Sequence, residues 1–380
     1  MLEKTKKFCD TFLSMGIPGF DLAVYKDGEC ILRYMNGYSD LENKIPMNGK
    51  EKYYIYSCSK PITCTAALQL YEKGLFSLDD RLCDYMPEFA EMTVQTEDGI
   101  KKTEKPILIK HLFEMTSGFS YDRYTHNFEQ CKKDTGGKCS TRDVMKYLAK
   151  DPLSFEPGDR WMYGLSHDVL AALIEVITGE TFEDYLKENI FIPLGITDTT
   201  FNVTDSVRMQ IAPQYAYSKA KGGIYNFGKG NDYIVGSDYL SGGAGCVSTV
   251  DDYMKFLEGL RTYRLLKKET VDLMREDRLS DWQRRTYVIA DTHGYGLGMR
   301  THKKDGIFTE LGWGGAAGAY LSVEFEHGIS LYFAQHVLDA PNQPLRERLN
   351  SFILAELFDN TEHKKRIENI TVGEGYKFTF

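Results

Sequence analysis

Short runs of β-branched and aromatic residues occur near both ends of the chain, and each run is bounded by turn-forming residues. The first two runs flank Asp27-Gly28, a dipeptide that is typical of two-residue hairpin turns. The last two are joined at His327-Gly328. The pattern therefore predicts strands near both termini, over residues 20–26, 30–35, 295–299, 319–325 and 329–335.

In the middle of the chain, apolar residues recur every three or four positions, which is the spacing of one helix face. Glycine or proline follows several of these segments, as is common after the C-terminus of a helix. Residues 219–236 are rich in glycine and aromatic side chains, so we expect an irregular loop there. The helices that we expect are residues 2–14, 57–73, 109–118, 141–150, 167–178, 181–189, 249–257 and 345–357.

Neither set of terminal strands can bury a core alone, so we expect them to join in one antiparallel sheet with the terminal helices packed on it. The helical middle would then be an insertion, which gives an α+β fold. The expected units are an α/β domain made of residues 1–56 and 286–358, and a mostly helical domain of residues 57–285. Residues 359–380 would form a C-terminal tail without a firm assignment.

Composition narrows the function. The 380 residues carry a net charge of −9 and no basic run, which argues against a nucleic-acid partner. We find no signal peptide and no apolar stretch of membrane-spanning length, so we expect a cytoplasmic protein. The eight cysteines are then expected to be free thiols. No H-E-x-x-H motif occurs, and we predict neither a metal nor a cofactor.

Ser57 and Lys60 form an S-x-x-K motif at the start of a predicted helix, where Pro61 is tolerated. Residues three apart on a helix share a face, so the lysine amine can reach the serine hydroxyl. A lysine that loses its proton on burial can activate a serine nucleophile. Alone, the motif is a weak signal, because most chance matches to it are solvated helix starts.

Further motifs follow in a fixed order, and together they resemble the serine β-lactamase and penicillin-binding-protein superfamily, especially its class C and family-VIII-esterase-like branch. The S-x-x-K motif is one of that superfamily's signatures. The resemblance covers roughly residues 10–357. The stretches that carry it are residues 56–61, 74–80, 111–118, 155–158 with 161–163, 193–199, 241–249 and 312–318.

The resemblance implies a helical domain beside an α/β domain, and it implies catalytic roles. Ser57 would be the acylated nucleophile, and Lys60 would help to deprotonate it. Tyr163 would be a phenolate or a hydrogen-bonded phenol that passes the proton to the leaving group, with its pKa lowered by a neighbouring lysine cation. The backbone N–H groups of Ser57 and Ala316 would form the oxyanion hole. Without the resemblance, Tyr163 would be interpreted as a buried structural tyrosine.

Two departures from the family pattern affect the residues that would bind substrate. Leu165 occupies the position of the family's asparagine after the tyrosine. Trp313 and Gly314 replace the lysine and threonine of the K-T-G element, of which Gly315 is kept. In penicillin-interacting members those polar groups recognise an amide and a carboxylate. Their loss favours a neutral ester, unless a residue elsewhere, such as Arg300 or His336, restores the charge.

The sequence therefore predicts a serine hydrolase with a small-molecule ester or amide substrate, most consistent with an esterase. A β-lactamase or D-Ala-D-Ala carboxypeptidase is the alternative, and an inactive protein that binds a cell-wall fragment is the second. The oligomeric state stays open. The run Ser166-His167-Asp168 is not a catalytic triad, because adjacent residues at a helix start point in different directions. We expect Ser166 to cap that helix.

Overall fold

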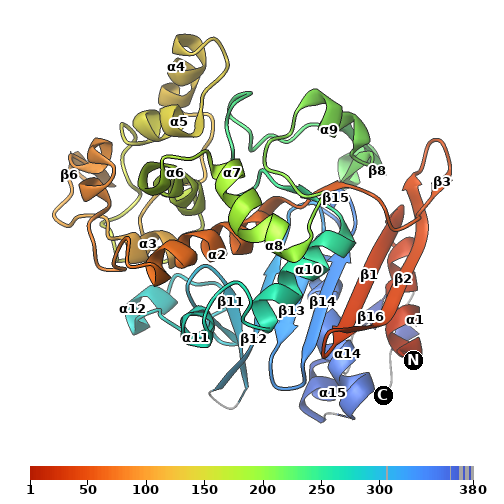
Figure 1. Cartoon of the computed structure of the whole chain (residues 1–380). Helices are drawn as coiled ribbons and strands as arrows, with labels where there is room; N and C mark the ends of the chain where they lie inside the picture. The colour runs from red at the N-terminus through yellow and green to blue at the C-terminus, as the bar shows by residue number, and fades with distance from the viewer. Residues whose placement is uncertain (305–306, 360, 368–370, 373–375, 378–380) are drawn as a thin grey trace.

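Strands from both ends of the chain join in one antiparallel sheet, as predicted (Figure 1). The computed structural model describes the whole chain except residues 305–306, 360, 368–370, 373–375 and 378–380. Within the described residues, the sheet has the strand order β10-β11-β12-β13-β14-β1-β2-β3. The N-terminal strand β1 pairs with the C-terminal strand β14, with Leu22 opposite Phe333. This pairing unites the two termini in one α+β domain.

The strands of the large sheet are β1 (Gly19–Lys26), β2 (Glu29–Asp40), β3 (Ile45–Pro46), β10 (His293–Tyr295), β11 (Arg300–Lys304), β12 (Ile307–Gly314), β13 (Tyr320–Glu324) and β14 (Ile329–Ala334). Smaller sheets contain β4 (Tyr53–Tyr54), β5 (Thr93–Thr96), β6 (Gly99–Lys102), β7 (Gln214–Ser218), β8 (Gly223–Gly228), β9 (Val247–Ser248), β15 (Val337–Leu338), β16 (Thr371–Val372) and β17 (Tyr376–Lys377).

The helices are α1 (Glu3–Ser14), α2 (Ser59–Glu72), α3 (Ile109–Phe113), α4 (His126–Asp134), α5 (Thr141–Leu148), α6 (Ser166–Thr178), α7 (Phe182–Leu186), α8 (Ile192–Leu194), α9 (Asp205–Gln210), α10 (Val250–Arg261), α11 (Lys268–Arg275), α12 (Asp281–Arg284), α13 (Gln343–Arg346), α14 (Leu349–Phe358) and α15 (Thr361–Ile367). Short 3-10 turns span Tyr56–Cys58, Leu82–Asp84, Pro87–Phe89 and Lys219–Lys221, and a π-turn spans Lys187–Phe191.

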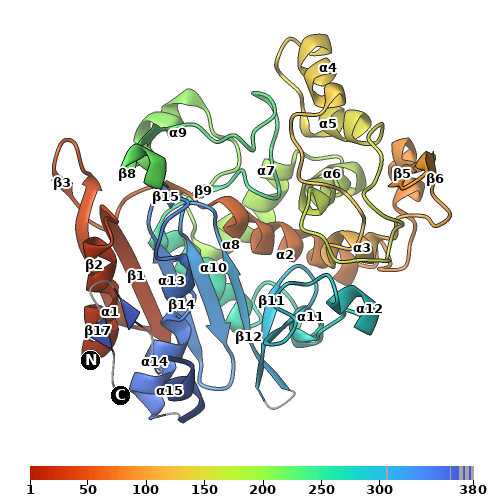
Figure 2. The same cartoon turned by 180° about the vertical axis from the view of Figure 1, so that it is seen from behind.

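Alternate side chains of the central strands enter two different cores, because successive residues of a strand point to opposite faces. Phe333 of β14 packs with the terminal helices α1 and α14, whose Phe8 and Phe352 rings stack 3.9 Å apart. Its neighbour Tyr332 faces the other way and stacks on Tyr253 of α10 at 4.2 Å. The terminal helices therefore cover one face of the sheet, and α10 covers the other (Figure 2).

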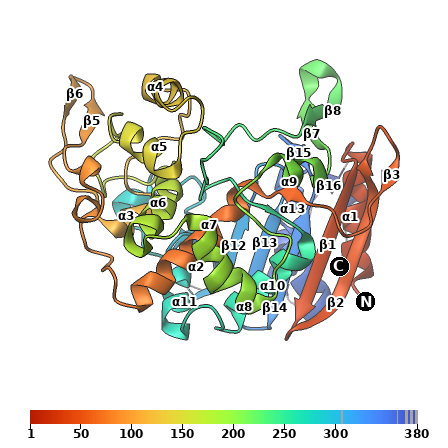
Figure 3. The same ribbon diagram turned by 45° about the horizontal axis from the view of Figure 1, so that its top comes forward.

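Helix α2 connects the sheet to the helical part of the molecule. It packs against α6, which also contacts α3, α5 and α7 (Figure 3). Helix α10 belongs to the segment 57–285 by sequence, but it lies against β1 and β14. The position of the boundary between the two domains stays a prediction.

Three local expectations were wrong. Strand β10 ends at Tyr295 rather than at Met299, because the chain turns at Gly298, whose φ is +81°. The expected irregular loop over 219–236 contains strand β8, which pairs with β7. Strands β11 and β12 were not predicted.

In the described part of the tail, helix α15 packs on α14. No helix that the structure describes combines the length and the hydropathy that a membrane crossing requires.

Candidate active site

Ser57 lies in the 3-10 turn that precedes helix α2. The residue before it, Tyr56, has a φ of +47°, a left-handed conformation that is uncommon outside glycine. The buried Tyr56 side chain donates a hydrogen bond to Gln214 at 2.6 Å. On the other side of Ser57, the Tyr253 hydroxyl donates to the carbonyl oxygen of Cys58 at 2.7 Å. These bonds hold the turn so that Ser57 stays partly exposed at the N-terminal end of α2.

Lys60 reaches Ser57 from beneath the surface. Its side chain is fully buried, and Nζ lies 3.2 Å from the Ser57 Oγ. Nζ also donates to the carbonyl oxygen of Gly243 at 2.7 Å and to the Tyr121 hydroxyl at 3.3 Å. Burial lowers the pKa of Lys60 to about 7, although the nearby Asp168 carboxylate acts in the opposite direction. A substantial fraction of Lys60 is therefore neutral near pH 7.

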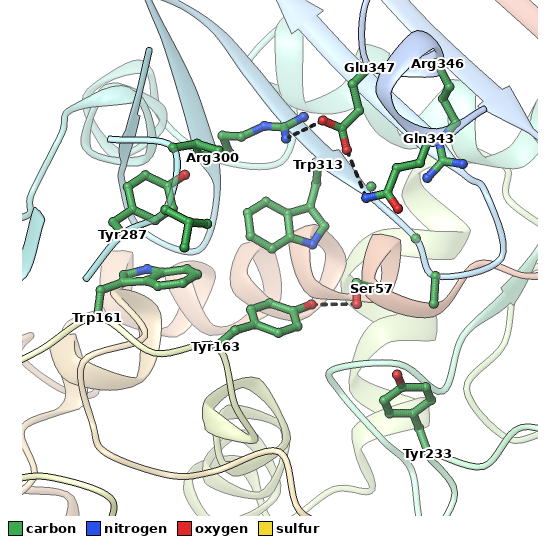
Figure 4. Close-up of a pocket in the computed structure, with 15 residues that line it drawn as sticks. Ser57, Trp161, Tyr163, Tyr233, Tyr287, Arg300, Trp313, Gln343, Arg346 and Glu347 are labelled. Atoms are coloured by element: carbon green, nitrogen blue, oxygen red, sulfur yellow. Dashed lines mark hydrogen bonds and ion pairs between the residues drawn. The ribbon is translucent and has the colours of Figure 1, made fainter. Parts of the chain in front are cut away.

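The Tyr163 hydroxyl donates a hydrogen bond to the same Ser57 oxygen at 2.6 Å (Figure 4). Burial raises the pKa of Tyr163, and the neighbouring Ser57 and Trp313 side chains offset this only in part. The expectation that a lysine cation lowers the pKa of Tyr163 was therefore wrong. Lys60 lies over the phenol ring, 4.5 Å from its centroid, rather than beside the hydroxyl. Tyr163 is a neutral phenol at neutral pH.

Buried polar residues that the sequence reasoning missed surround Lys60. Asp168 accepts hydrogen bonds from Tyr239 at 2.7 Å and from Ser241 at 2.6 Å. Ser241 belongs to the segment that carries Gly243, the backbone acceptor of Lys60. Tyr121 stacks on Tyr163 with ring centroids 5.3 Å apart. Tyr121 follows a recognised glycine motif by three residues, but no local pattern marks it as part of the site.

The run Ser166-His167-Asp168 does not form a relay. The Ser166 hydroxyl hydrogen-bonds to that of Ser117 at 2.8 Å. The His167 ring is buried, and neither of its nitrogens has a hydrogen-bond partner in the described part of the chain. The expectation that Ser166 caps α6 was wrong: the helix begins at Ser166, and the preceding residue, Leu165, makes no side-chain cap.

The loop after β12 lies directly against the chain that leads to Ser57. A Cβ atom on Gly315 would overlap the carbonyl oxygen of Ile55, so this position requires glycine. Gly315 N donates to Ala319 at 2.8 Å and closes the loop. Ala316 and Ser57 both line the pocket described next. The assignment of their backbone N–H groups as an oxyanion hole stays a prediction.

A pocket of about 320 Å³ opens at Ser57, and five of the fifteen residues that line it are aromatic. Trp161 packs against Tyr287 with ring centroids 4.6 Å apart, and Trp313 packs against Tyr163 at 5.8 Å. In Figure 4 these rings form one side of the pocket, with the indole N–H of Trp313 turned toward the Tyr163 hydroxyl. The lining residues are Ser57, Trp161, Tyr163, Tyr233, Tyr287, Val288, Ile289, Arg300, Trp313, Gly314, Gly315, Ala316, Gln343, Arg346 and Glu347.

Two residues that the sequence placed near substrate are elsewhere. Leu165 does not line this pocket, because its side chain is buried in the core of the helical part, where it packs at the start of α6. His336 is also outside it, with its Nδ1 3.1 Å from the carbonyl oxygen of Ala212. Burial lowers the pKa of His336 to about 4, so it is neutral at pH 7. Arg300, in contrast, does line the pocket.

Metal-ligating side chains gather away from Ser57. In the described residues, Glu324, Glu326 and His327 lie together at the turn between β13 and β14. His327 Nδ1 is 3.0 Å from a Glu324 carboxylate oxygen, so these two side chains are hydrogen-bonded to each other. None of the three lines the aromatic pocket.

Known proteins share this fold and parts of this sequence. The esterase EstB of Burkholderia gladioli is 29% identical over 297 residues, which cover 73% of this chain and 72% of that protein. The lovastatin esterase of Penicillium rubens is 29% identical over 303 residues, covering 72% and 76%. The structure of unliganded simvastatin synthase from Aspergillus terreus matches with a TM-score of 0.76 at 24% identity, over 94% of this chain and 98% of that one. A family model described as Beta-lactamase matches residues 7–350. The chain therefore belongs to the Beta-lactamase family.

Proposed function

We propose that this protein is a serine hydrolase that transfers acyl groups from small esters through an acyl-enzyme on Ser57. One observation carries the proposal: the Ser57 oxygen is contacted at 2.6 Å by Tyr163 and at 3.2 Å by Lys60, at the mouth of an aromatic pocket. A serine hydroxyl needs a base within hydrogen-bond reach to become a nucleophile. Two candidate proton-transfer groups lie within that reach.

In the first half-reaction, neutral Lys60 accepts the proton of Ser57 as its oxygen attacks the ester carbonyl. The C–O bond to Ser57 forms, and the carbonyl oxygen becomes an oxyanion. The N–H groups of Ser57 and Ala316 stabilise that charge, and each such donor contributes roughly 3–4 kcal/mol to the lowering of the barrier. Tyr163 then donates its proton to the alcohol oxygen as the C–O bond to the alcohol breaks. The Lys60 ammonium returns a proton to the Tyr163 oxygen.

In the second half-reaction, an acceptor with an O–H group attacks the acyl-enzyme by the reverse sequence of proton transfers. Water as the acceptor gives ester hydrolysis, and an alcohol gives acyl transfer. Both outcomes occur among similar proteins, which include the two esterases above and the acyltransferase mokF of Monascus pilosus, 32% identical over 263 residues. Whether water or an alcohol accepts the acyl group therefore has to be measured in addition to the formation of the acyl-enzyme.

Ester substrates are favoured by the aromatic walls of the pocket and by the missing family groups. Trp313 offers one N–H donor and a large apolar face, where a K-T-G lysine would offer a cation. A β-lactamase or D-Ala-D-Ala carboxypeptidase is the alternative, and one observation favours it. Arg300 and Arg346 line the pocket, so a substrate carboxylate would not lack a cation there. An inactive binding protein is the second alternative.

Covalent labelling tests the proposal. We expect a fluorophosphonate and a p-nitrophenyl ester to add one acyl or phosphonyl group, detected by intact mass, with the adduct mapped to Ser57. Ser57→Ala should lose both the label and hydrolysis, because in the described residues no other hydroxyl is hydrogen-bonded to both Lys60 and Tyr163. Ser166→Ala is the matched control and should keep both. An adduct on another residue would refute the assignment, and binding of a penicillin without acylation would favour the inactive protein.

A further inference from the structure

Two cysteine thiols are neighbours at the C-terminal end of helix α4, in the helical part of the molecule (Figure 1). Cys131 belongs to the helix, and Cys139 follows the turn that ends it. Both side chains are buried, both thiols are free, and neither lines the pocket at Ser57. Burial raises the pKa of Cys131 to about 12, and the neighbouring Cys139 thiol acts in the same direction.

Thr135 connects the two cysteines. Its hydroxyl donates to the carbonyl oxygen of Cys131 at 2.8 Å and accepts from the backbone N–H of Cys139 at 3.0 Å. The same oxygen lies 3.3 Å from the Cys139 Sγ. The φ of Cys139 is +44°, a left-handed conformation that is uncommon outside glycine. The chain therefore folds back on α4 and brings the second thiol to the first.

The turn that carries Cys139 also contacts a segment that leads to the active site. The backbone N–H groups of Ser237 and Asp238 donate to the carbonyl oxygens of the two residues before Cys139, at 3.1 and 2.9 Å. A Cβ atom on Gly236 would lie 2.6 Å from the Cβ of Cys139, so the two chains are in close contact. A shift of Cys139 would therefore be transmitted to residues 236–238.

Residues close to this segment belong to the site around Ser57. Tyr233 lines the pocket. Tyr239 and Ser241 donate hydrogen bonds to Asp168, the carboxylate that acts on the pKa of Lys60. The turn at Cys139 is thus connected to the proton-transfer groups by one short stretch of backbone.

We propose that Cys131 and Cys139 are a redox-active dithiol that a peroxide converts to a disulfide, and that this disulfide slows the reaction at Ser57. The disulfide itself does not depend on the proposed function, whereas its effect on the reaction does. Cys139 directly follows the exposed residues 136–138, so it is the thiol that we expect to react first.

The oxidation takes place in two steps. Hydrogen peroxide converts the Cys139 thiol to a sulfenic acid and is itself reduced to water. The Cys131 sulfur then attacks the Cys139 sulfur, the S–S bond forms, and the hydroxyl group leaves with the Cys131 proton as a second water. The bonded sulfur atoms must approach to about 2 Å. Because Cys131 is fixed in a helix, we expect Cys139 to move toward α4 and away from residues 236–238.

Mass spectrometry of the peroxide-treated protein tests the modification. We expect a loss of two hydrogen atoms, a peptide pair joined through Cys131 and Cys139 in a map without reductant, and recovery of both thiols with dithiothreitol. Cys30 is exposed and serves as the internal control, since it should be oxidised without joining either residue. The inference is wrong if both thiols stay unmodified, if they are oxidised without joining, or if either joins another cysteine.

The rate at which a fluorophosphonate labels Ser57 measures the effect on the reaction. We expect peroxide to lower this rate by about tenfold or more, because small displacements of catalytic groups cost much rate. Dithiothreitol should restore it. Cys139→Ala should keep the rate of the reduced protein and no longer respond to peroxide, and Cys131→Ala should behave alike. Cys83→Ala, at a half-buried cysteine elsewhere, should respond as the native protein does.

The outcomes separate this inference from the catalytic proposal. A disulfide in a protein that neither an ester nor a fluorophosphonate acylates would support the dithiol site and refute the hydrolase. A labelled Ser57 whose rate is unchanged by the disulfide, or is lowered by peroxide equally in the native protein and in both alanine variants, would refute the effect on the reaction. Thermal unfolding of each variant identifies a lost fold, and the peptide map of the native protein needs no variant.

Discussion

Lys60 and Tyr163 contact the same serine oxygen, and burial shifts the pKa of each in the direction that favours its neutral form. A low-dielectric environment disfavours the charged state of any group, so the pKa of a lysine falls and that of a phenol rises. Lys60, with a pKa of about 7, can accept a proton at neutral pH, while Tyr163 keeps its own. These directions support the proposed roles, in which Lys60 is the base and Tyr163 is the proton donor.

The pH dependence of ester hydrolysis follows from this assignment. The base is the neutral amine, so activity is low where Lys60 is protonated and rises as the pH passes about 7. We expect kcat/KM for a p-nitrophenyl ester, measured from pH 5 to 9, to show a rising limb with a midpoint near 7. Tyr163→Phe should lower the rate without moving that midpoint. A midpoint near 10 would instead indicate an unperturbed lysine or an ionising tyrosine.

Lys60 and Tyr163 should behave as one proton-transfer unit. Replacement of either by Ala or Phe, respectively, should lower kcat by about 10²–10⁴, the usual contribution of a positioned acid or base. Because each needs the other to complete the transfer, the double variant should be scarcely slower than the slower single variant. Single-turnover acylation rates measure this directly. Fully multiplicative losses would show that the two residues act independently.

At the residue scale, contacts between residues that are close in the sequence could be predicted. Ser57 and Lys60 are three positions apart at a helix start, and that spacing alone brings them together. Tyr163 is 106 positions from Ser57 and was assigned only through the resemblance. The direction of its pKa shift depends on burial, which no local pattern encodes. Arg346 was missed because a single arginine at the end of a short helix gives no sign in the sequence that it is buried.

At the scale of elements, the strands with regular apolar patterns were predicted and the strand that borders the site was not. Strand β12 ends in Gly312, Trp313 and Gly314, and glycine is depleted in strands. It also carries the buried Glu310, which is hydrogen-bonded by Asn350 of α14. Both features obscure a strand in the sequence. The next residue after the strand, Gly315, allows the loop after β12 to lie against the chain that leads to Ser57.

That close approach gives a test at the same scale. Gly315→Ala should force the loop away from Ile55, two residues before Ser57, because the added methyl group would overlap the Ile55 carbonyl oxygen. Overpacking of this kind typically costs about 1–3 kcal/mol of unfolding free energy. Urea unfolding should show this loss, together with reduced acylation of Ser57. Gly314→Ala is the control for stability, since its Cβ would lie 3.6 Å from the nearest atom. Equal stability of both variants would contradict the packing argument.

At the scale of the molecule, the sheet built from both termini was predicted correctly from one physical requirement, the burial of apolar faces. Substrate choice was harder to predict, because the pocket wall comes from segments far apart in the sequence, near residues 57, 161, 287, 313 and 346. The sequence argument for a neutral substrate assumed that no cation would lie near it. Arg300 and Arg346 line the pocket, so that assumption does not hold. The proposed preference for esters over β-lactams then depends on the shape and chemistry of the aromatic side chains.

We expect Trp313 to determine that preference. Its ring packs between Tyr163 and Tyr295, with centroids 5.8 and 5.7 Å away, and fills the position where a K-T-G lysine would stand. We expect the native protein to hydrolyse a short p-nitrophenyl ester with a higher kcat/KM than a chromogenic cephalosporin. Trp313→Lys should raise the ratio of cephalosporin to ester turnover by about tenfold, the effect of one added charge-assisted contact. Trp313→Leu, which removes the ring without adding charge, should not raise this ratio.

If the native protein turns over the cephalosporin faster than the ester, a β-lactamase replaces the esterase as the proposed function. An equal gain from Trp313→Leu would show that the indole acts by its bulk and not by displacing a cation.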